Sequence, residues 1–435
     1  MLWLVASLFL LAIAFALGLD ALAYAMYALL GLMLISRLLS KKWIESLSAS
    51  RRANRDEAEI GQKCAVNIDI RNGSGLPIAW VLAEELLPRK AMFFNPPSLK
   101  IEGQRLLLSI FWPRQTRTLR YEVTCNRRGY YQLGPLVLET GDLFGLHRRF
   151  RIETEPHYLT VYPKVIPLEG YDIASRRPIG EVRMTHRLFE DPTRVTGVRA
   201  YQAGDSMNRI HWRATARTGT LQSKTYEPST IAGATIILDL HESTHPAKDE
   251  PVRSDLGVTA AASLANTLYL MGQQVGFITN GRDMSDRARF DHPHGVAGTR
   301  QAARSGGAMA DTSSRLRPII VPTRRGPEQF FQIREMLARA ELTDGFRLPE
   351  LIDEVYSQLP RDASVIVITP QVTPEVSIAL GELSRAGYAV TAILNLWEDY
   401  DFAQQAGPLA AQRIEVRHLK EESRISTICR RLSLR

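Results

Sequence analysis

Residues 234–240 read ATIILDL, an apolar run interrupted only by Asp239 near its end. A run of this length predicts a strand that is buried on both faces. Residues 274–279 (QVGFIT) form a second such run. Between them, residues 253–271 carry apolar side chains at helical spacing, at Leu256, Ala260, Leu264 and Leu268. Strand, helix and strand in this order predict a mainly parallel sheet that is covered by helices.

The same alternation continues toward the C-terminus. Pro327 and Pro349 each stand where a helix would begin, because proline is favoured at the first helical position. Residues 364–369 (SVIVIT) and 388–394 (YAVTAIL) are further apolar strands, with a helix expected near 374–386. Apolar strands that alternate with amphipathic helices predict an α/β, Rossmann-type domain.

We place this α/β domain at residues 166–435. It contains one long interruption, because residues 281–318 are rich in Gly, Ser, Arg and Asp and show no hydrophobic period. We predict a long mobile loop there.

Residues 58–165 show a different pattern. Val66, Ile68 and Ile70 alternate with polar residues, and the turn signal Asn-Gly-Ser-Gly follows at 72–75. Alternation returns at 117–125 (RTLRYEVTC), and residues 130–140 are expected to run back beside it. Short alternating strands without a long helical pattern predict an antiparallel β-sandwich.

The N-terminus is strongly apolar. Residues 2–19 and 21–36 carry no charge, and Asp20 separates them. About eighteen apolar residues in a helix rise roughly 27 Å, close to the thickness of a hydrocarbon core. We predict a transmembrane helical hairpin over residues 1–40. The alternatives are a cleaved signal peptide, disfavoured because the first residues lack Lys and Arg, and a buried soluble hairpin.

Basic residues set the expected orientation. The segment 41–57 follows the second span and carries Lys41, Lys42, Arg51, Arg52 and Arg55. The positive-inside rule therefore places the soluble domains on the cytoplasmic side of the plasma membrane, with two N-terminal spans. We expect Trp43 at the membrane interface. The reverse topology, an extracellular adhesion module, is disfavoured by these basic residues.

The net charge and the cysteine content limit the kinds of partner and site that we expect. The chain has 54 Lys and Arg against 46 Asp and Glu, a formal net charge of +8 that is spread along the sequence. This excess suits an anionic lipid surface, and no nucleic-acid recognition motif accompanies it. Three widely spaced cysteines, Cys64, Cys125 and Cys429, form neither a disulfide framework nor a zinc cluster.

Two kinds of chemistry are conceivable where the strand 234–240 ends. Residues 241–245 read His-Glu-Ser-Thr-His, the formal pattern of zinc hydrolases. A metal-dependent hydrolase using Asp239, His241, Glu242 and His245 is therefore one hypothesis. Its context is unfavourable, because the five residues follow a strand directly and Pro246 disfavours helical geometry at His245.

The same loop resembles the metal-binding Asp-x-Ser-x-Ser loop of von Willebrand factor A domains. Asp239 and Ser243 match that pattern, and His241 stands in place of the first Ser. The resemblance implies oxygen ligands for Mg²⁺. We expect no cofactor otherwise. The alternative is a polar loop in which Ser243 caps the following residues.

The most distinctive segment is 197–217. It contains Gly204-Asp205, a turn or helix-start signal, and then Arg209, Trp212 and Arg213 within about one helical turn. From the residues alone we expect a capped surface helix whose tryptophan lies in the core.

This segment resembles the signature of the domain-of-unknown-function 58 family. The matching residues are Tyr201, Gly204, Asp205, Arg209, Ile210, Trp212 and Arg217. Residues 128–135 (RGYYQLGP), 142–146 (DLFGL) and 161–163 (VYP) are similar to the family's upstream β-domain and the join that follows it. The family's shared domain is similar to a von Willebrand factor A fold.

The family has no settled activity. The resemblance implies that the protein occurs beside MoxR-type AAA+ ATPases and other membrane proteins. We therefore expect a non-enzymatic, membrane-anchored scaffold or adaptor whose signature segment binds a protein partner, with roles in assembly or in the cell envelope.

Overall fold

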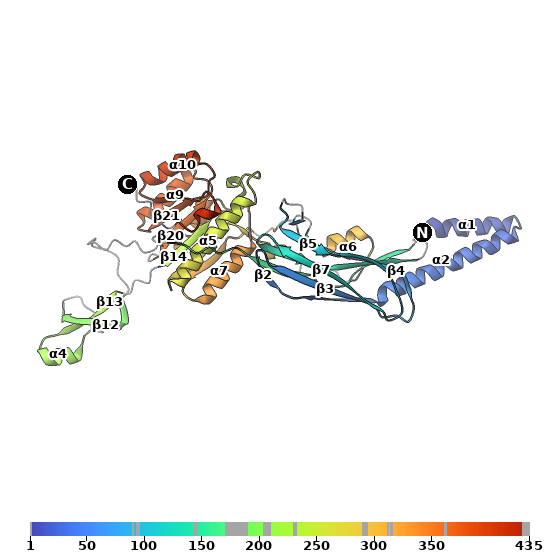
Figure 1. Ribbon diagram of the computed structural model, residues 1–435, viewed down its shortest axis with the longest axis horizontal. Helices are drawn as coiled ribbons and strands as arrows, with labels where there is room; N and C mark the ends of the chain where they lie inside the picture. The colour runs from blue at the N-terminus through green and yellow to red at the C-terminus, as the bar shows by residue number, and fades with distance from the viewer. Residues whose placement is uncertain are drawn as a thin grey trace. The chain divides into compact units, whose positions relative to one another are not determined.

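The computed structural model divides the chain into two compact units (Figure 1). The first is formed by Met1–Lys164, Gly281–Arg317 and Arg334–Leu342, and the second by Val165–Asn280, Pro318–Ile333 and Thr343–Arg435. The residues described are 2–88, 91–92, 96–142, 147–169, 190–202, 210–228, 233–288, 295–310, 313, 316–360 and 363–428. The multi-domain organisation is confirmed, but the single predicted domain over 166–435 differs from this division.

Two apolar helices begin the chain, α1 (Leu2–Ala16) and α2 (Asp20–Ser46). They pack against each other, with the rings of Phe15 and Tyr27 edge to face at 6.2 Å between centroids. The first helix is shorter than predicted because Gly18 adopts a positive φ of 64°, which ends it. By length and composition, α2 can cross a membrane, whereas α1 is too short to pass the same test.

The last part of α2 belongs to the core of the first unit. Trp43 and Ile44 are buried among the strands. The guanidinium of Arg151 donates to the carbonyls of Ile44 and Glu45 at 3.2 and 3.1 Å, which satisfies carbonyls that the helix end leaves free. The prediction of an interfacial Trp43 is therefore wrong. The segment predicted as a separate basic linker, 41–57, instead completes α2 and forms the first strand.

The first unit is β-rich, as predicted. Its strands are β1 (Leu47–Ala53), β2 (Glu57–Glu59), β3 (Lys63–Asn72), β4 (Ile78–Glu85), β5 (Leu99–Gly103), β6 (Leu106–Phe111), β7 (Thr116–Cys125), β8 (Gly129–Leu133), β9 (Leu136–Gly141), β10 (Arg148–Ile152) and β11 (His157–Tyr162). One antiparallel sheet has the order β1-β3-β7-β5. In a second sheet β10, β9, β4 and β6 are neighbours in that order. Their inward-facing residues share one core, in which Val66, Ile68 and Ile70 are fully buried.

The expected return of 130–140 beside 117–125 does not occur. Strand β8 pairs with β11, and β9 pairs with β4 and β10. A third sheet of order β2-β11-β8 results. Cys64 and Cys125 are free, buried thiols, as expected, and Cys429 lies outside the described residues.

The prediction of one unstructured loop over 281–318 is wrong for its described residues. They form β16 (Arg282–Asp283), the 3-10 turn η3 (Met284–Arg287), β17 (Gly295–Ala297) and α6 (Arg300–Gly307). Strand β17 extends the second sheet beside β10. Arg300 and Arg304 of α6 both contact the carboxylate of Glu84. Because β17 and α6 find their partners on strands that are distant in the sequence, no local hydrophobic period predicts these two elements.

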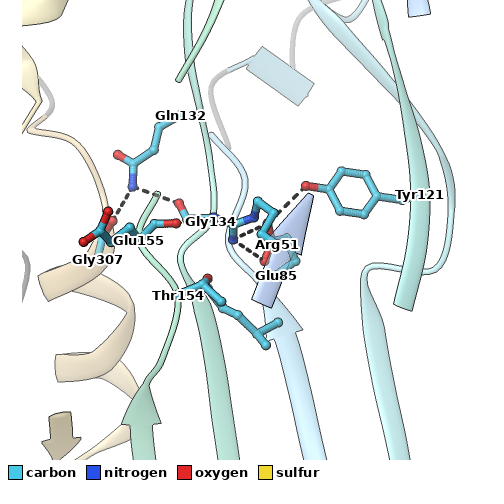
Figure 2. Close-up of polar contacts among 9 residues, drawn as sticks. Arg51, Glu85, Tyr121, Gln132, Gly134, Thr154, Glu155 and Gly307 are labelled. Carbon is cyan, nitrogen blue, oxygen red and sulfur yellow. Dashed lines mark hydrogen bonds and ion pairs between the residues drawn. The ribbon is translucent and has the colours of Figure 1, made fainter. Parts of the chain in front are cut away.

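A buried ion pair joins the two main sheets of the first unit (Figure 2). The guanidinium of Arg51, on β1, donates to both carboxylate oxygens of Glu85, on β4, at 2.7 and 2.9 Å. The hydroxyl of Tyr121, on β7, donates to the same carboxylate at 3.1 Å. Burial raises the pKa of the Glu85 carboxyl, and the neighbouring guanidinium opposes that rise.

Gly134, in the stretch 128–135, lies beside this pair. It has a positive φ of 86°, and a Cβ added there would lie 1.9 Å from a terminal nitrogen of Arg51, so only glycine fits. The amide of Gln132 donates to the carbonyls of Gly134 and Gly307, which attaches the end of α6 to the strands (Figure 2). Two residues of the RGYYQLGP sequence are therefore explained, Gly134 by close approach to Arg51 and Gln132 by its hydrogen bonds.

The second unit contains a six-stranded sheet. Its order is β18-β15-β14-β20-β21-β22, and all neighbours are parallel except β18. The strands are β14 (Gly233–Leu238), β15 (Gln274–Thr279), β18 (Ile319–Arg324), β20 (Ser364–Thr369), β21 (Val390–Leu394) and β22 (Glu415–His418). The helices that accompany them are α5 (Val252–Leu270), α7 (Pro327–Arg339), α8 (Leu348–Val355), α9 (Pro374–Arg385) and α10 (Asp399–Ala411).

Helices cover both faces of this sheet. Leu238 and Ile368 lie beneath Gly257 of α5. The adjacent residues Ile237 and Val367 point the other way, into a core shared with α8, α9 and α10. The strands at 234–240, 274–279, 364–369 and 388–394 are confirmed, as are the four predicted helices. Strands β18 and β22 and helix α10 were not predicted from the sequence.

We predict that Arg51→Met destabilises the first unit by about 3–5 kcal/mol, because it leaves the Glu85 carboxylate buried and uncompensated. Arg51→Met combined with Glu85→Met should cost less than the single change. Hydrogen exchange of the β1 and β4 amides in the full chain measures both.

The matched control is Lys63→Met. Lys63 also pairs with glutamates across strands, but its pair with Glu102 is about half exposed. We expect this change to leave the stability almost unchanged, because water screens an exposed ion pair. Equal losses for Lys63→Met and Arg51→Met would contradict the role assigned to the buried pair.

Candidate functional site

A polar residue stands at the carboxyl end of each central parallel strand. Asp239 follows β14, Asn280 follows β15, Thr369 ends β20 and Asn395 follows β21. All four are buried. Because the carboxyl ends of parallel strands share one edge, these side chains gather there, where ligands of open α/β sheets bind.

Asp239 is the centre of this cluster. One carboxylate oxygen accepts from the amide of Asn280 at 2.9 Å and from the backbone N–H of His241 at 3.1 Å. The other accepts from the hydroxyls of Thr369 at 3.0 Å and Thr244 at 3.2 Å. Four donors from three parts of the chain thus occupy the carboxylate, which ties the sheet's carboxyl edge together.

Ser243 does not meet Asp239. Its hydroxyl bonds the Nδ1 of His241 at 2.7 Å, and its backbone N–H donates to the same nitrogen at 3.1 Å. His241 rather than Ser243 therefore caps the short 3-10 turn η2 (Glu242–Thr244). The hydroxyl that reaches Asp239 belongs to Thr244, one residue later than the family pattern suggested.

The hydrolase hypothesis involves the same loop. Its two histidines are buried, and the Nδ1 of His245 lies 3.1 Å from the carbonyl of His241. Glu242 is exposed at the start of the turn. Among the residues that the structure describes, no group of three or more His, Cys, Asp or Glu could hold a metal ion.

A buried cation lies beside the cluster and was missed by the sequence analysis. Arg253, on α5, donates to the side-chain oxygen of Asn395 at 2.8 Å, and its guanidinium stacks 3.4 Å from the ring centroid of Trp397. It also donates to the carbonyls of Leu419 and Lys420. Burial lowers the pKa of Arg253 to about 10, so the group stays charged at neutral pH. The rule that polar residues end buried strands could have found Asn280 and Asn395.

The signature segment is described in part. Gly204, Asp205 and Arg209 lie outside the described residues. Tyr201 ends the antiparallel pair of β12 (Glu190–Ala200) and β13 (Gln222–Pro228), with its N–H donating to the carbonyl of Leu221 at 2.9 Å. Ile210 is buried and bridges to Ser223 of β13.

A short helix, α4 (Trp212–Thr218), follows and carries the last signature residues. The side chain of His211 caps it by accepting from the N–H of Ala214 at 3.1 Å, and Gly219 ends it with a φ of 70°. Trp212 is 68% exposed, and Arg217 is exposed as well. The expectation of a core tryptophan is therefore wrong.

This exposed tryptophan and most of its strand pair lie in a stretch that matches a protein family. Residues 197–291 match the family described as "Protein of unknown function DUF58". The DUF58 match covers the end of β12 and all of α4, β13, β14, α5 and β15, and so includes Asp239 and the described signature residues.

The chain is also similar to a curated protein, the "Uncharacterized protein YeaD" of Bacillus subtilis (strain 168). The two are 24% identical over 262 residues, which is 60% of this chain and 62% of the relative. The chain therefore spans less than two thirds of that relative's length.

Solved structures show weaker similarity. The CARDB domain of PF1109 from Pyrococcus furiosus gives a TM-score of 0.18 at 11% identity, covering 27% of this chain and 94% of that one. Proximal thread matrix protein 1 of the mussel byssus gives a TM-score of 0.30 at 12% identity, covering 46% and 45%. At these scores neither similarity carries an argument about fold.

We predict that Asp239→Asn destabilises the second unit by roughly 2–4 kcal/mol, because it removes a charge that four donors share. Ser243→Ala should cost less than about 1 kcal/mol, since only the hydroxyl's hydrogen bond to His241 is lost. Hydrogen exchange of β14 and β20 measures the difference. Mg²⁺ should leave the melting temperature of the wild-type chain unchanged. A Mg²⁺-dependent rise that Asp239→Asn abolishes would instead establish Asp239 as a metal ligand.

Proposed function

We propose that this protein is a membrane-anchored, non-enzymatic scaffold or adaptor. Its α/β domain, interpreted as von Willebrand factor A-like, binds a protein partner, and we take that partner to be a MoxR-type AAA+ ATPase in assembly or cell-envelope processes. The observation that carries the proposal is the 68% exposure of Trp212 within the DUF58-matching segment.

The membrane anchor is supported by the surface of the first two helices. Both expose many large apolar side chains, including Phe9, Phe15, Tyr24, Leu34 and Leu38. Exposed apolar side chains in such number are unfavourable in water but suit lipid. We propose that α1 and α2 form a hairpin in the bilayer, so that both ends lie on the cytoplasmic side with the basic residues that follow.

The von Willebrand-like interpretation is supported by the sheet of the second unit. Numbered along the chain, its strands lie in the order 3-2-1-4-5-6, with an antiparallel third strand at the edge. This is the order of doubly wound sheets, which use their carboxyl edge for binding. The hydrogen-bonded cluster at Asp239 favours a rigid edge that presents a partner surface over one that holds a metal.

The partner surface is supported by the residues around α4. Val198, Trp212 and Leu221 are exposed apolar side chains on or beside the β12–β13 pair. Basic residues accompany them, at Arg199, Arg213, Arg217 and Lys224. Tryptophan and arginine are the residue types most often found at binding hot spots, so an acidic partner surface with an apolar pocket would fit.

We predict that the full chain stays in the membrane after carbonate extraction and that Gly31→Arg weakens this retention. Gly31 lies in the apolar part of α2 with open space around it, so the new side chain meets lipid rather than protein. A central arginine costs about 2.5–3.5 kcal/mol of insertion free energy. Gly75→Arg, also in open space but on a turn of the first unit, is the control. A wild-type chain that washes off would contradict the anchor.

We predict that the tagged full chain, in mild detergent, recovers a MoxR-type AAA+ ATPase and that Trp212→Ala reduces recovery at least tenfold, the loss typical of a hot-spot residue. Trp112→Ala is the control, because Trp112 is 63% exposed but lies in the first unit. Immunoblotting of the ATPase quantifies recovery. No recovered ATPase, or equal loss in both variants, would argue against this partner surface.

A further inference from the structure

A groove lies within the first unit where α2 meets the strands. Its volume is about 550 Å³, within the range of small-molecule sites, roughly 300–1,000 Å³. The residues that line it are Leu34, Arg37, Leu38, Lys41, Ile44, Glu45, Arg149 and Val296. Six of them come from one face of α2, one from β10 and one from β17.

The polar part of this groove is cationic. Arg37, Lys41 and Arg149 contribute three positive charges against the single negative charge of Glu45. Glu45 stands one turn after Lys41 on α2, with 4.0 Å between their charged atoms, and both side chains are largely exposed. Among the described residues, neither Arg37 nor Arg149 has an ion-pair partner, so two guanidinium groups are available to an anion.

The apolar part of the groove continues onto the helix surface. Leu34 and Leu38 are 61% and 59% exposed and stand one helical turn apart. They line the groove together with Ile44, which is buried and comes later on α2. Arg37 follows the first residue of α2 by 17 positions, which is about 26 Å of helix and close to the thickness of a hydrocarbon core. Arg37 thus lies at headgroup depth, and Leu34, about one turn earlier on α2, lies on its acyl side.

We propose that this groove binds the phosphate of an anionic glycerophospholipid. Arg37 and Arg149 hold the phosphate oxygens as paired donors, Lys41 adds a point charge, and an acyl chain lies along Leu34. Basic pockets beside membrane helices bind anionic headgroups in this manner. The assignment rests on the proposed membrane anchor, and it adds that the anchor selects its lipid.

Native mass spectrometry of the full chain in mild detergent tests the proposal, with phosphatidylglycerol and phosphatidylcholine as probes. The wild-type chain should retain phosphatidylglycerol in preference. Arg37→Gln combined with Arg149→Gln should lower that affinity at least about tenfold, because each guanidinium donates charge-assisted hydrogen bonds directly to the phosphate.

The control is Lys42→Gln combined with Arg148→Gln. These residues are the sequence neighbours of groove residues on the same two elements, and neither lines the groove. Arg148 instead faces Glu139, 3.5 Å away. The control should change affinity less than about twofold, because screened charges outside the site contribute little. Equal losses in the two double variants would reduce the effect to general surface charge and overturn the proposal.

Two further measurements distinguish a lipid phosphate from free phosphate, and a failure of the groove proposal from a failure of the membrane anchor. Leu34→Asn should weaken phosphatidylglycerol binding, and inorganic phosphate should not displace the lipid. Unchanged affinity in Leu34→Asn together with displacement by phosphate would identify a free-anion site and overturn the lipid assignment. A chain that resists carbonate but shows no lipid preference rejects only the groove, whereas a chain that washes off rejects the anchor itself.

Discussion

The first unit depends on one buried ion pair, in which Arg51 of β1 bonds Glu85 of β4 and Tyr121 of β7 completes the contact. A buried charge without its partner is strongly destabilising, so the two sheets must close with these strands opposed. Because β1 continues directly from α2, the same contact also constrains the end of the long apolar helix. Gly134 is then constrained, since it packs against the same guanidinium, and Gln132 donates to the carbonyl of Gly134.

The first unit is also completed by residues far along the chain. Strand β17 extends its second sheet, and α6 attaches through two arginines to Glu84. Arg128 donates to the carbonyls of Leu337 and Ala340, at the end of α7, at 2.8 Å each. The chain therefore crosses between its two compact units several times, which couples the folding of the β-rich unit to synthesis of nearly the whole polypeptide.

The second unit places its polar residues differently. The polar residues at its strand ends hydrogen-bond with nearby groups of the same unit. Four donors contact the carboxylate of Asp239, and the side-chain oxygen of Asn395 accepts from the buried Arg253. Such a satisfied network favours rigidity over reactivity. The surface that we propose for a partner is elsewhere, on α4 and the β12–β13 pair, where Trp212 is exposed although tryptophan is costly to leave in water.

Local pattern alone determined much of this protein. The apolar runs predicted α2, β14, β15, β20 and β21, and helical spacing predicted α5, because these elements bury whole faces and so carry a period in the sequence. Only the tertiary structure decided the rest. The residues of α6 and β17 have no hydrophobic period, since distant charges and strand pairing hold them, and Trp43 reads as interfacial until the strands cover it. The donor to Asp239 proved to be Thr244 rather than Ser243, because backbone geometry in a turn, not spacing, directs a hydroxyl.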